Sequence, residues 1–287
     1  MGARIQDAQG GFIYCEAEKL KGCDIQLDYP SVGATENIML ASVFAEGETI
    51  IRNAAKEPEI VDLQSFMNGM GVEVSGAGTS IIRIKGKSGG LRDVEFTVMT
   101  DRIVAGTYMI AAAITGGDVM LRHVIPEHLN SIISNLIDCG CRIDIKNTDL
   151  HINAPVKCKS ADIIRTLPYP GFPTDMQAQM VSLLSVARGT SIIVETVFEN
   201  RYKHVEELLR MGANIKLEGR IAVIKGVKKL TGATVSARDL RAGAALVIAG
   251  MSAEGETIVT DIKHIDRGYE RIEEKLNLLG ANIIREV

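Results

Sequence analysis

The sequence predicts an α/β fold built from helix–strand–helix–strand–strand units, with four intact repeats and a partial one. Two phrases that recur with one period support this prediction. The phrase MGARI at position 1 returns as MGVEV at 70, CGCRI at 139, MGANI at 211 and LGANI at 279. A second phrase places a glycine at 47, 117, 189 and 255. Two independent phrases with a common period indicate an array of similar units.

The first helix of each unit is expected at 31–46, 101–115, 173–188 and 239–254. These segments are rich in Ala, Met, Leu and Ile and are apolar on nearly all sides, which is typical of a buried helix. The recurring glycine is expected to end each helix in a left-handed conformation. A short β-branched strand then follows at 49–52, 119–122, 191–194 and 257–260.

The second helix of each unit is amphipathic, as in 58–71 and 267–280, with apolar residues three and four positions apart. Two strands follow, for example at 72–76 and 80–86, joined by the turn Gly76-Ala77-Gly78. Such a small unit cannot bury both helices by itself. The units are therefore expected to pack together, with the buried helices inside a ring of strands.

The Gly-rich, polar stretch 86–100 predicts a boundary between domains at 1–99 and 100–287. The chain opens in mid-unit, so we expect that about one and a half units precede Met1 in a longer protein. Residues 1–99 would then present apolar helix faces without a partner. We expect this domain to be poorly stable or to self-associate, and 100–287 to fold better.

Composition excludes several classes of function. The net charge is −4, so no basic surface predicts binding to nucleic acid or to an acidic membrane. Two of the longest uncharged stretches, 103–117 and 176–187, are too short to span a bilayer. The N-terminus has no apolar signal region, so we expect a cytoplasmic protein. The five cysteines are odd in number and do not join the five histidines at zinc spacing, which predicts reduced thiols and no metal site.

Polar clusters lie at equivalent helix starts. Ser31, Asp101, Pro173 and Asp239 each stand 16 residues before the recurring glycine. Helix N-termini attract anions, although such residues are also ordinary caps. Four arginines favour the anion: an arginine in a first helical turn opposes the helix dipole, and an anionic ligand would compensate it. They are Arg102, Arg201, Arg241 and Arg267.

Four long segments resemble the bacterial UDP-N-acetylglucosamine 1-carboxyvinyltransferase family. They are NAAKEPEIVDL (53–63), YPGFPTDMQAQ (169–179), ETVFENRYKHVEELLRMGA (195–213) and HIDRGYERIEEKLNLLGA (264–281). The resemblance covers the whole chain and implies an inside-out α/β barrel of the enolpyruvyl transferase kind, with three units in each of two domains. Residues 1–99 would be an incomplete sugar-nucleotide-side domain without its N-terminal half, and 100–287 a nearly complete second domain.

The resemblance also implies an activity. The family transfers the enolpyruvyl group of phosphoenolpyruvate to the 3′-hydroxyl of UDP-N-acetylglucosamine by addition and elimination. This is the first committed step of peptidoglycan synthesis, on which cell-wall formation, cell shape and division depend. The reaction needs a base, an acid and cations for the carboxylate and phosphate of phosphoenolpyruvate. Both compounds are substrates, and no metal or organic cofactor is implied.

Site residues follow from the family motifs. Asp175 in FPTDMQ would lie beside the sugar hydroxyl, as its base or as the group that orients its proton. Arg241 and Arg267 would meet phosphoenolpyruvate, with Asp239 supporting them.

Further residues would bind the sugar nucleotide. Val197 and Phe198 would do so through their backbone, and Ser31, Val32 and Gly33 would contact the diphosphate. Glu199, Arg201 and Arg102 would support the same cleft.

Three family motifs do not occur in this chain: an N-terminal Lys-Asn pair, a following Arg, and a Gly-Gly-Cys loop whose cysteine is the usual general acid. Cys23 in LKGCDIQ does not match that loop and is not given its role. The chain is therefore expected to be inactive without an added N-terminal segment. Two alternatives stay open. One is a non-catalytic UDP-N-acetylglucosamine-binding fragment, and the other is 3-phosphoshikimate 1-carboxyvinyltransferase, against which EPEIVDL and ETVFENR argue.

Overall fold

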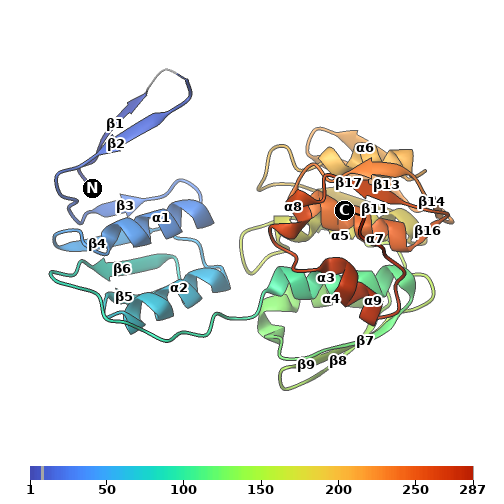
Figure 1. Cartoon of the computed structure of the whole chain (residues 1–287), viewed down its shortest axis with the longest axis horizontal. Coiled ribbons are helices and arrows are strands. Elements are labelled where there is room, and N and C mark those ends of the chain that lie inside the picture. Colours follow the sequence, from blue (N-terminus) through green and yellow to red (C-terminus); the bar gives the residue numbers. More distant parts are fainter. Residues whose placement is uncertain (8–9, 287) are drawn as a thin grey trace. The chain divides into compact units, whose positions relative to one another are not determined.

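The computed structural model describes residues 1–7 and 10–286, and the chain divides into two compact units, Met1–Met99 and Thr100–Val287 (Figure 1). Each unit has a hydrophobic core of its own. Met39, Ile51 and Ile82 are fully buried in the first, and Met109 and Leu246 in the second.

The first unit contains a four-stranded sheet covered by two helices. The strand order is β3-β4-β6-β5, and only the β3–β4 pair is parallel. Alternate residues of β4 and β6 are buried under the helices, as expected for a sheet with one solvated face. A separate antiparallel hairpin, β1–β2, precedes the sheet. The elements are β1 Arg4–Asp7, β2 Ile13–Glu16, β3 Asp24–Gln26, α1 Val32–Ser42, β4 Glu48–Arg52, α2 Pro58–Gly69, β5 Glu73–Ser75 and β6 Ile81–Lys85.

The second unit repeats this strand order. Strands β10 Ile163–Arg165, β11 Thr190–Val194, β12 Asn214–Glu218 and β13 Ile221–Lys225 form a sheet of order β10-β11-β13-β12. A three-stranded sheet of order β7-β9-β8 comprises β7 Asp118–Leu121, β8 Arg142–Lys146 and β9 Asp149–Asn153. The second unit also contains two separate parallel strand pairs, β14–β16 and β15–β17. Their strands are β14 Leu230–Thr231, β15 Thr234–Ser236, β16 Ala253–Glu254 and β17 Ile258–Thr260.

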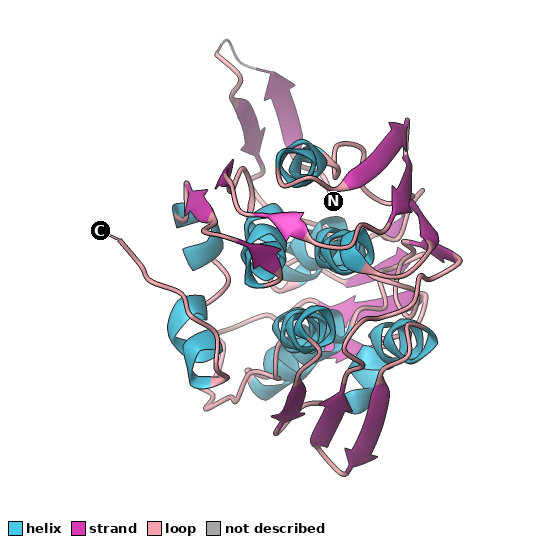
Figure 2. Cartoon of the chain, turned by 90° about the vertical axis from the view of Figure 1, so that its right-hand side faces the viewer, coloured by secondary structure: helices cyan, strands magenta, loops and turns pink. Residues whose placement is uncertain are grey.

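Three long helices occupy the interior of the second unit. Helices α3 Arg102–Thr115, α5 Gln177–Val186 and α7 Leu240–Met251 pack against one another. Figure 2 shows the chain from a side on which several helices are seen end-on. Most residues of α3, α5 and α7 are buried on every side. This arrangement confirms the predicted core of apolar helices with strands outside. The remaining helices are η1 Pro126–Leu129, α4 Asn130–Asp138, η2 Thr174–Met176, α6 Lys203–Arg210, α8 Lys263–Asp266 and α9 Ile272–Leu278.

A short leading strand before the first helix was missed by the sequence analysis. Strands β3, β10 and β15 each pair in parallel with the strand that follows that helix. Three residues are too few to show a period of two, so no pattern predicted them. The repeated unit is therefore strand–helix–strand–helix–strand–strand where it is complete.

The prediction that a glycine ends each first helix was wrong in detail. Only α3 has a glycine cap, and it is Gly116, with φ 69°, rather than Gly117. The other first helices end at Val43, Ala187 and Ser252. The recurring glycines lie in the following turns, where left-handed φ angles of 85° to 118° explain the residue type: Gly47, Gly189 and Gly255.

Two further expectations differ from the structure. Helix α1 is not buried all round, because Leu40 is 54% exposed and Phe44, just beyond its end, is 58% exposed. The helix expected at 267–280 is interrupted, since α8 ends before Arg267 and α9 begins at Ile272. The intervening chain departs from the helix where Tyr269 is buried in the core. Residues 281–286 form no strand, so the last unit ends with its second helix in the described part of the chain.

Across residues 1–7 and 10–286, no helix is long and apolar enough to cross a membrane. In the same ranges, no three His, Cys, Asp or Glu side chains are placed to hold a metal ion together.

Candidate active site

The four positions predicted to be equivalent are all helix N-caps. Ser31 caps α1, Asp101 caps α3, Pro173 caps the short η2 that leads into α5, and Asp239 caps α7. The side chains of Ser31, Asp101 and Asp239 accept hydrogen bonds from backbone amides of the first turn. The four positions are thus equivalent as predicted, and the three polar caps also satisfy amides that would otherwise lack a partner, whereas Pro173 makes no side-chain cap bond.

Three helix starts, those of η2, α6 and α7, bring together a carboxylate and two arginines. Asp175 Oδ1 accepts a hydrogen bond from Arg201 Nη2 and another, 3.2 Å long, from Arg241 Nε. Arg241 lies in the first turn of α7, as predicted. Arg201 does not lie in a first turn, because it precedes Tyr202, the N-cap of α6. The arginine side chains are 13% and 17% exposed, and that of Asp175 is 41% exposed. The cluster is thus half-enclosed, with the carboxylate on its open side.

The charges of this cluster set its protonation. Burial acts to raise the pKa of the Asp175 carboxyl, but the charges of Arg241 and Arg201 and their hydrogen bonds outweigh burial and lower that pKa below its ordinary value. Burial acts to lower the pKa of Arg241, and Asp175 and the hydroxyl of Tyr269 overcome it and raise that pKa. The cluster therefore contains an ionised carboxylate between two guanidinium cations.

Asp239 stabilises the start of α7. Its Oδ1 accepts hydrogen bonds from the backbone amides of Arg241 and Ala242, both 2.9 Å long. These bonds fix the first turn of α7, which carries the Arg241 side chain into the cluster. Asp239 thus acts on Arg241 through the backbone in this structure.

Glu195 organises the neighbouring loop, and the sequence analysis did not single it out. Its side chain is 1% exposed. Oε1 accepts hydrogen bonds of 2.9 Å from the amides of Val197 and Phe198 and one of 2.8 Å from the hydroxyl of Thr166. Oε2 accepts a 2.9 Å bond from the hydroxyl of Thr174. One buried carboxylate therefore holds both the 197–198 backbone and the residue before Asp175.

The Phe198 side chain packs on the cluster. The Arg201 guanidinium carbon lies 5.1 Å from the Phe198 ring centroid, within range of a cation–π contact. Arg201 Nε also donates a 3.3 Å bond to the Thr174 carbonyl. Phe198, predicted with Val197 to bind a sugar nucleotide through the backbone, thus packs on the arginine that pairs with Asp175.

A buried polar group, the Tyr269 hydroxyl, lies between the three core helices. The sequence analysis did not predict it. Thr107 of α3, Gln179 of α5 and Arg241 of α7 all contact the hydroxyl of Tyr269. The sequence places Thr107 and Gln179 in helices expected to be buried, but it does not predict which side chains they meet.

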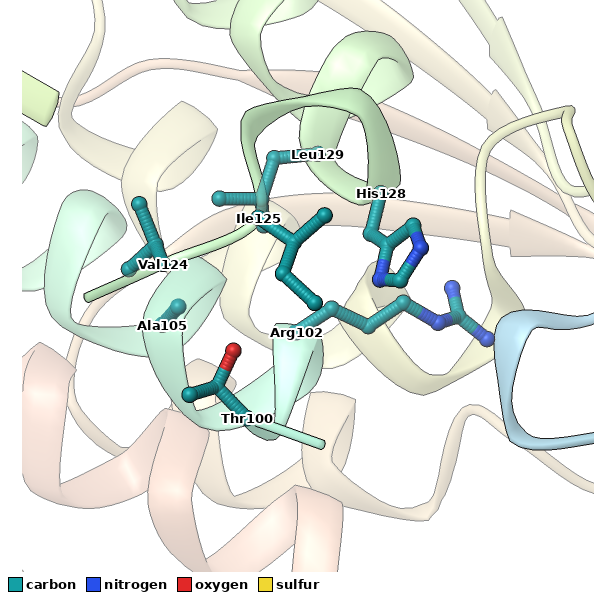
Figure 3. A pocket seen from close by; sticks show the side chains of 7 residues that line it. All are labelled: Thr100, Arg102, Ala105, Val124, Ile125, His128 and Leu129. Atoms are coloured by element: carbon teal, nitrogen blue, oxygen red, sulfur yellow. The ribbon is translucent and has the colours of Figure 1, made fainter. Parts of the chain in front are cut away.

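Arg102 is buried at the start of α3, and its guanidinium carbon lies 5.6 Å from the Tyr169 ring centroid. It lines a small pocket with Val124, Leu129 and His128 (Figure 3). In that view the Arg102 side chain extends past the His128 imidazole and away from the apolar side chains. Its guanidinium therefore lies at the polar edge of the pocket.

Glu199 and Arg267 are further predicted site residues that lie outside the Asp175 cluster. The Glu199 side chain is 82% exposed and pairs at 3.3 Å with Arg220. Arg267 is exposed at the C-cap of α8, not in a first helical turn. The prediction that Arg267 opposes a helix dipole was therefore wrong, because a cation at a helix C-terminus is favoured without any ligand. Arg267 nonetheless lies near the cluster along the chain, because Tyr269, whose hydroxyl contacts Arg241, follows two residues later.

Ser31, Val32 and Gly33 lie at the start of α1 in the first unit. Ser31 Oγ accepts a 3.3 Å bond from the amide of Ala34, as an ordinary cap does. A side chain added at Gly33 would meet no atom within 4 Å. The helix start is therefore open on the side of Gly33, which leaves room for a ligand.

Comparison with known proteins first defines the class. The family described as EPSP synthase (3-phosphoshikimate 1-carboxyvinyltransferase) matches residues 1–276. The enolpyruvyl transferase NikO from Streptomyces tendae superimposes with a TM-score of 0.86 at 25% identity, over 98% of this chain and 69% of NikO. EPSP synthase from Acinetobacter baumannii superimposes with a TM-score of 0.70 at 21% identity, over 98% of this chain and 68% of that one, which shows the fold alone. The chain has the inside-out α/β fold of the enolpyruvyl transferases.

Closer relatives then define the family. UDP-N-acetylglucosamine 1-carboxyvinyltransferase 1 of Caldanaerobacter subterraneus subsp. tengcongensis is 58% identical over 96% of this chain and 66% of its own length. The second such enzyme of that organism is 55% identical over 99% of this chain and 68% of its own length. The chain belongs to the UDP-N-acetylglucosamine 1-carboxyvinyltransferase family, and it spans about two thirds of the length of these relatives.

Proposed function

We propose that this chain contributes the Asp175 half of an active site that transfers the enolpyruvyl group of phosphoenolpyruvate to the 3′-hydroxyl of UDP-N-acetylglucosamine. The observation that carries the proposal is the Asp175–Arg201–Arg241 cluster, which sets an ionised carboxylate beside two cations at helix starts. The names of relatives 55% to 58% identical support the choice of substrates. We also propose that the protein lies in the cytoplasm and that this reaction is the first committed step of peptidoglycan synthesis.

The chemistry proceeds in two steps. In the addition, the sugar oxygen bonds to C2 of phosphoenolpyruvate, its proton passes to a carboxylate, and C3 gains a proton from an acid. In the elimination, C3 loses a proton and the bond from C2 to the phosphate oxygen breaks, which releases phosphate and leaves the enol ether. Asp175 is the carboxylate that meets the sugar hydroxyl. Its Oδ2 has no hydrogen-bond partner among the described residues and is the oxygen available to that hydroxyl.

The arginines decide how strong a base Asp175 is. While both guanidinium groups face it, the lowered pKa makes Asp175 a weak base. Phosphoenolpyruvate is an anion that competes for Arg241, and Nη2 of Arg241 has no hydrogen-bond partner in the described part of the chain. When the substrate takes up the charge of Arg241, the pKa of Asp175 rises. Binding of one substrate thus prepares the base for the other.

The remaining residues bind and orient. Val197 and Phe198, fixed by Glu195, offer their backbone to the sugar nucleotide, while Ser31, Val32 and Gly33 offer a helix start to its diphosphate. Arg267 receives the carboxylate or phosphate of phosphoenolpyruvate, and Arg102 and Glu199 support the binding of the substrates. No residue of this chain matches the cysteine motif of the family acid, so the donation of the proton to C3 is not assigned to a residue of this chain.

The experiment is phosphate release from phosphoenolpyruvate, measured with UDP-N-acetylglucosamine and with shikimate 3-phosphate as acceptors. We expect release only with UDP-N-acetylglucosamine, and only after the N-terminal segment of a relative is added. D175N should then lower kcat by about 100-fold or more, whereas D93N, at an exposed position outside the cluster, should not. Release with shikimate 3-phosphate would contradict the proposed acceptor.

A second candidate function is binding without turnover. The preformed Val197–Phe198 loop favours it, because that loop needs no upstream segment to be ordered. Calorimetry with UDP-N-acetylglucosamine and the chain alone separates the two functions. Heat of binding with no turnover after addition of the N-terminal segment would favour the binding protein.

A further inference from the structure

The hydroxyl of Tyr269 is the meeting point of three core helices. Its ring is 2% exposed, and its oxygen lies 2.8 Å from Thr107 Oγ1, 3.3 Å from Gln179 Nε2 and 3.5 Å from Arg241 Nη1. These partners come from α3, α5 and α7 respectively. The chain therefore leaves its helical path after Arg267 and places one polar atom among three apolar helices.

The available protons fix the direction of each bond. Thr107 donates its single proton to the Ile103 carbonyl at 2.8 Å, so its oxygen can only accept from Tyr269. Tyr269 thus donates to Thr107, and its oxygen accepts from Gln179 and Arg241. If the Gln179 amide were reversed, its oxygen would face the hydroxyls of Thr107 and Tyr269. That oxygen and the Thr107 oxygen, 2.8 Å from Tyr269, would then compete for the one proton of Tyr269. The lone pairs of Tyr269 are consequently directed at Arg241 and Gln179.

Arg241 is held at two points as a result. Its Nε donates to Asp175 and its Nη1 to Tyr269. A planar guanidinium held by one contact can still turn about it, and a second contact fixes the plane. The two contacts leave Nη2 as the nitrogen without a partner in the described residues. Tyr269 therefore determines which edge of Arg241 is presented to a ligand.

We infer that Tyr269 is a positioning residue, whose hydroxyl fixes the Arg241 guanidinium against Asp175 and anchors the Arg267 segment to the same point. Arg267 stands two residues before Tyr269, so one buried ring sets the location of both candidate phosphoenolpyruvate-binding arginines. The kinetic consequence of this inference depends on the proposed function, whereas the structural consequence does not.

The structural test is the hydrogen exchange of the Arg241 Nε–H group, observed by NMR in the whole chain labelled with ¹⁵N-arginine and assigned with R241K. In Y269F the bond from Arg241 Nη1 to Tyr269 is lost, so the guanidinium can turn and its Nε–H bond to Asp175 should open more often; we expect this proton to exchange roughly tenfold faster or more. The matched control is Y108F, which removes a partly buried hydroxyl from α3 for which no hydrogen bond is observed among the described residues. Equal exchange in Y269F and in the unsubstituted chain would overturn the inference.

The kinetic test uses the chain supplemented with the N-terminal segment. Y269F should lower kcat/KM for phosphoenolpyruvate roughly tenfold or more, with KM for UDP-N-acetylglucosamine unchanged and Y108F unaffected. An equal loss for both substrates would indicate a merely structural role and overturn the inference. Absence of turnover in the unsubstituted protein would contradict only the proposed function, since the exchange measurement still decides the role of Tyr269.

A second variant covers the case in which Y269F does not fold. T107V removes the oxygen that accepts the Tyr269 proton and keeps the ring in place. The hydroxyl proton then turns toward Gln179 or Arg241 and weakens their bonds to Tyr269. We expect faster exchange at Arg241 Nε–H, by a smaller factor than in Y269F. A folded T107V with unchanged exchange would contradict the inference.

Discussion

Glu195 Oε2 accepts a 2.9 Å hydrogen bond from the hydroxyl of Thr174, the residue immediately before Asp175. Through this bond and those to Val197 and Phe198, the buried Glu195 side chain fixes two segments of the candidate site relative to each other. The same relationship makes the Glu195 carboxylate important for stability, because four donors depend on it.

Replacing Glu195 should therefore destabilise the fold. In E195A, two amides and two hydroxyls lose their acceptor, and the free energy of unfolding should fall by at least about 2 kcal/mol. E195Q should fall less, because its amide oxygen can still accept from Val197 and Phe198 and its NH₂ can donate to Thr174. Urea unfolding at pH 7 measures both. E199A, at an exposed position in the same segment, is the control, and equal stability of E195A and E199A would refute the assignment.

The Asp175 ion pairs should appear in the pH dependence of stability. The folded-state pKa of Asp175 is lowered, so its stabilising contribution is present above the ordinary value of 3.8 and is lost as pH falls through the folded value. The difference in unfolding free energy between the unsubstituted chain and D175N should be largest near neutral pH and shrink in acid. Urea titrations from pH 7 to pH 3 measure this difference. A difference independent of pH would argue against the ion pairs.

His204 should make the fold sensitive to acid in another window. Burial lowers the pKa of His204 to about 4 from 6.5, and nearby Asp239 only partly opposes this. Between these values the unfolded chain binds a proton that the folded chain does not, so stability falls as pH drops from about 6.5 to about 4. The fall should amount to roughly 3 kcal/mol. H204Q should flatten this slope while H264Q keeps it, and an unchanged slope in H204Q would show that His204 is not the group responsible.

Helix α1 should make the first unit less stable than the second. Its exposed Leu40 and the nearby Phe44 leave apolar surface in water, whereas the core helices of the second unit are enclosed. Hydrogen exchange on the whole chain should show faster opening in 1–99 than in 100–287. If the chain self-associates, a double change of L40K and F44K should reduce its sedimentation coefficient at high concentration. Equal protection of both units would contradict this expectation.

The exposed thiols should react faster than the buried ones. Cys15 is exposed and Cys23 partly exposed, while Cys139, Cys141 and Cys158 are buried. Burial raises the pKa of Cys139 to about 12, which leaves almost no reactive thiolate at neutral pH. Iodoacetamide should label Cys15 and then Cys23 in the native chain, and the other three only in urea. Mass spectrometry of the labelled peptides is the measurement, and early labelling of Cys139 would contradict the packing.

The sequence by itself determined the repeated unit, the buried first helices and their N-caps. It could do so because helix periodicity, capping and a recurring glycine are local properties that appear within about twenty residues. The family resemblance also singled out Asp175 and Arg241 from motifs that surround them. No pattern predicted the leading strands, which are too short to show a period, or the exposed side of α1.

Only the tertiary structure decided which side chains meet. Asp175 and Arg241 are 66 residues apart in the chain, and Tyr269 and Thr107 are 162 apart. Such pairs form only when the repeats pack together. The spacing of residues along one helix does not predict which side chains of other repeats they will contact. Glu195 and Tyr269 escaped the sequence analysis for this reason. Their importance lies in buried hydrogen bonds whose partners come from other elements, and burial in a shared core is a property of the packed units, not of any one segment.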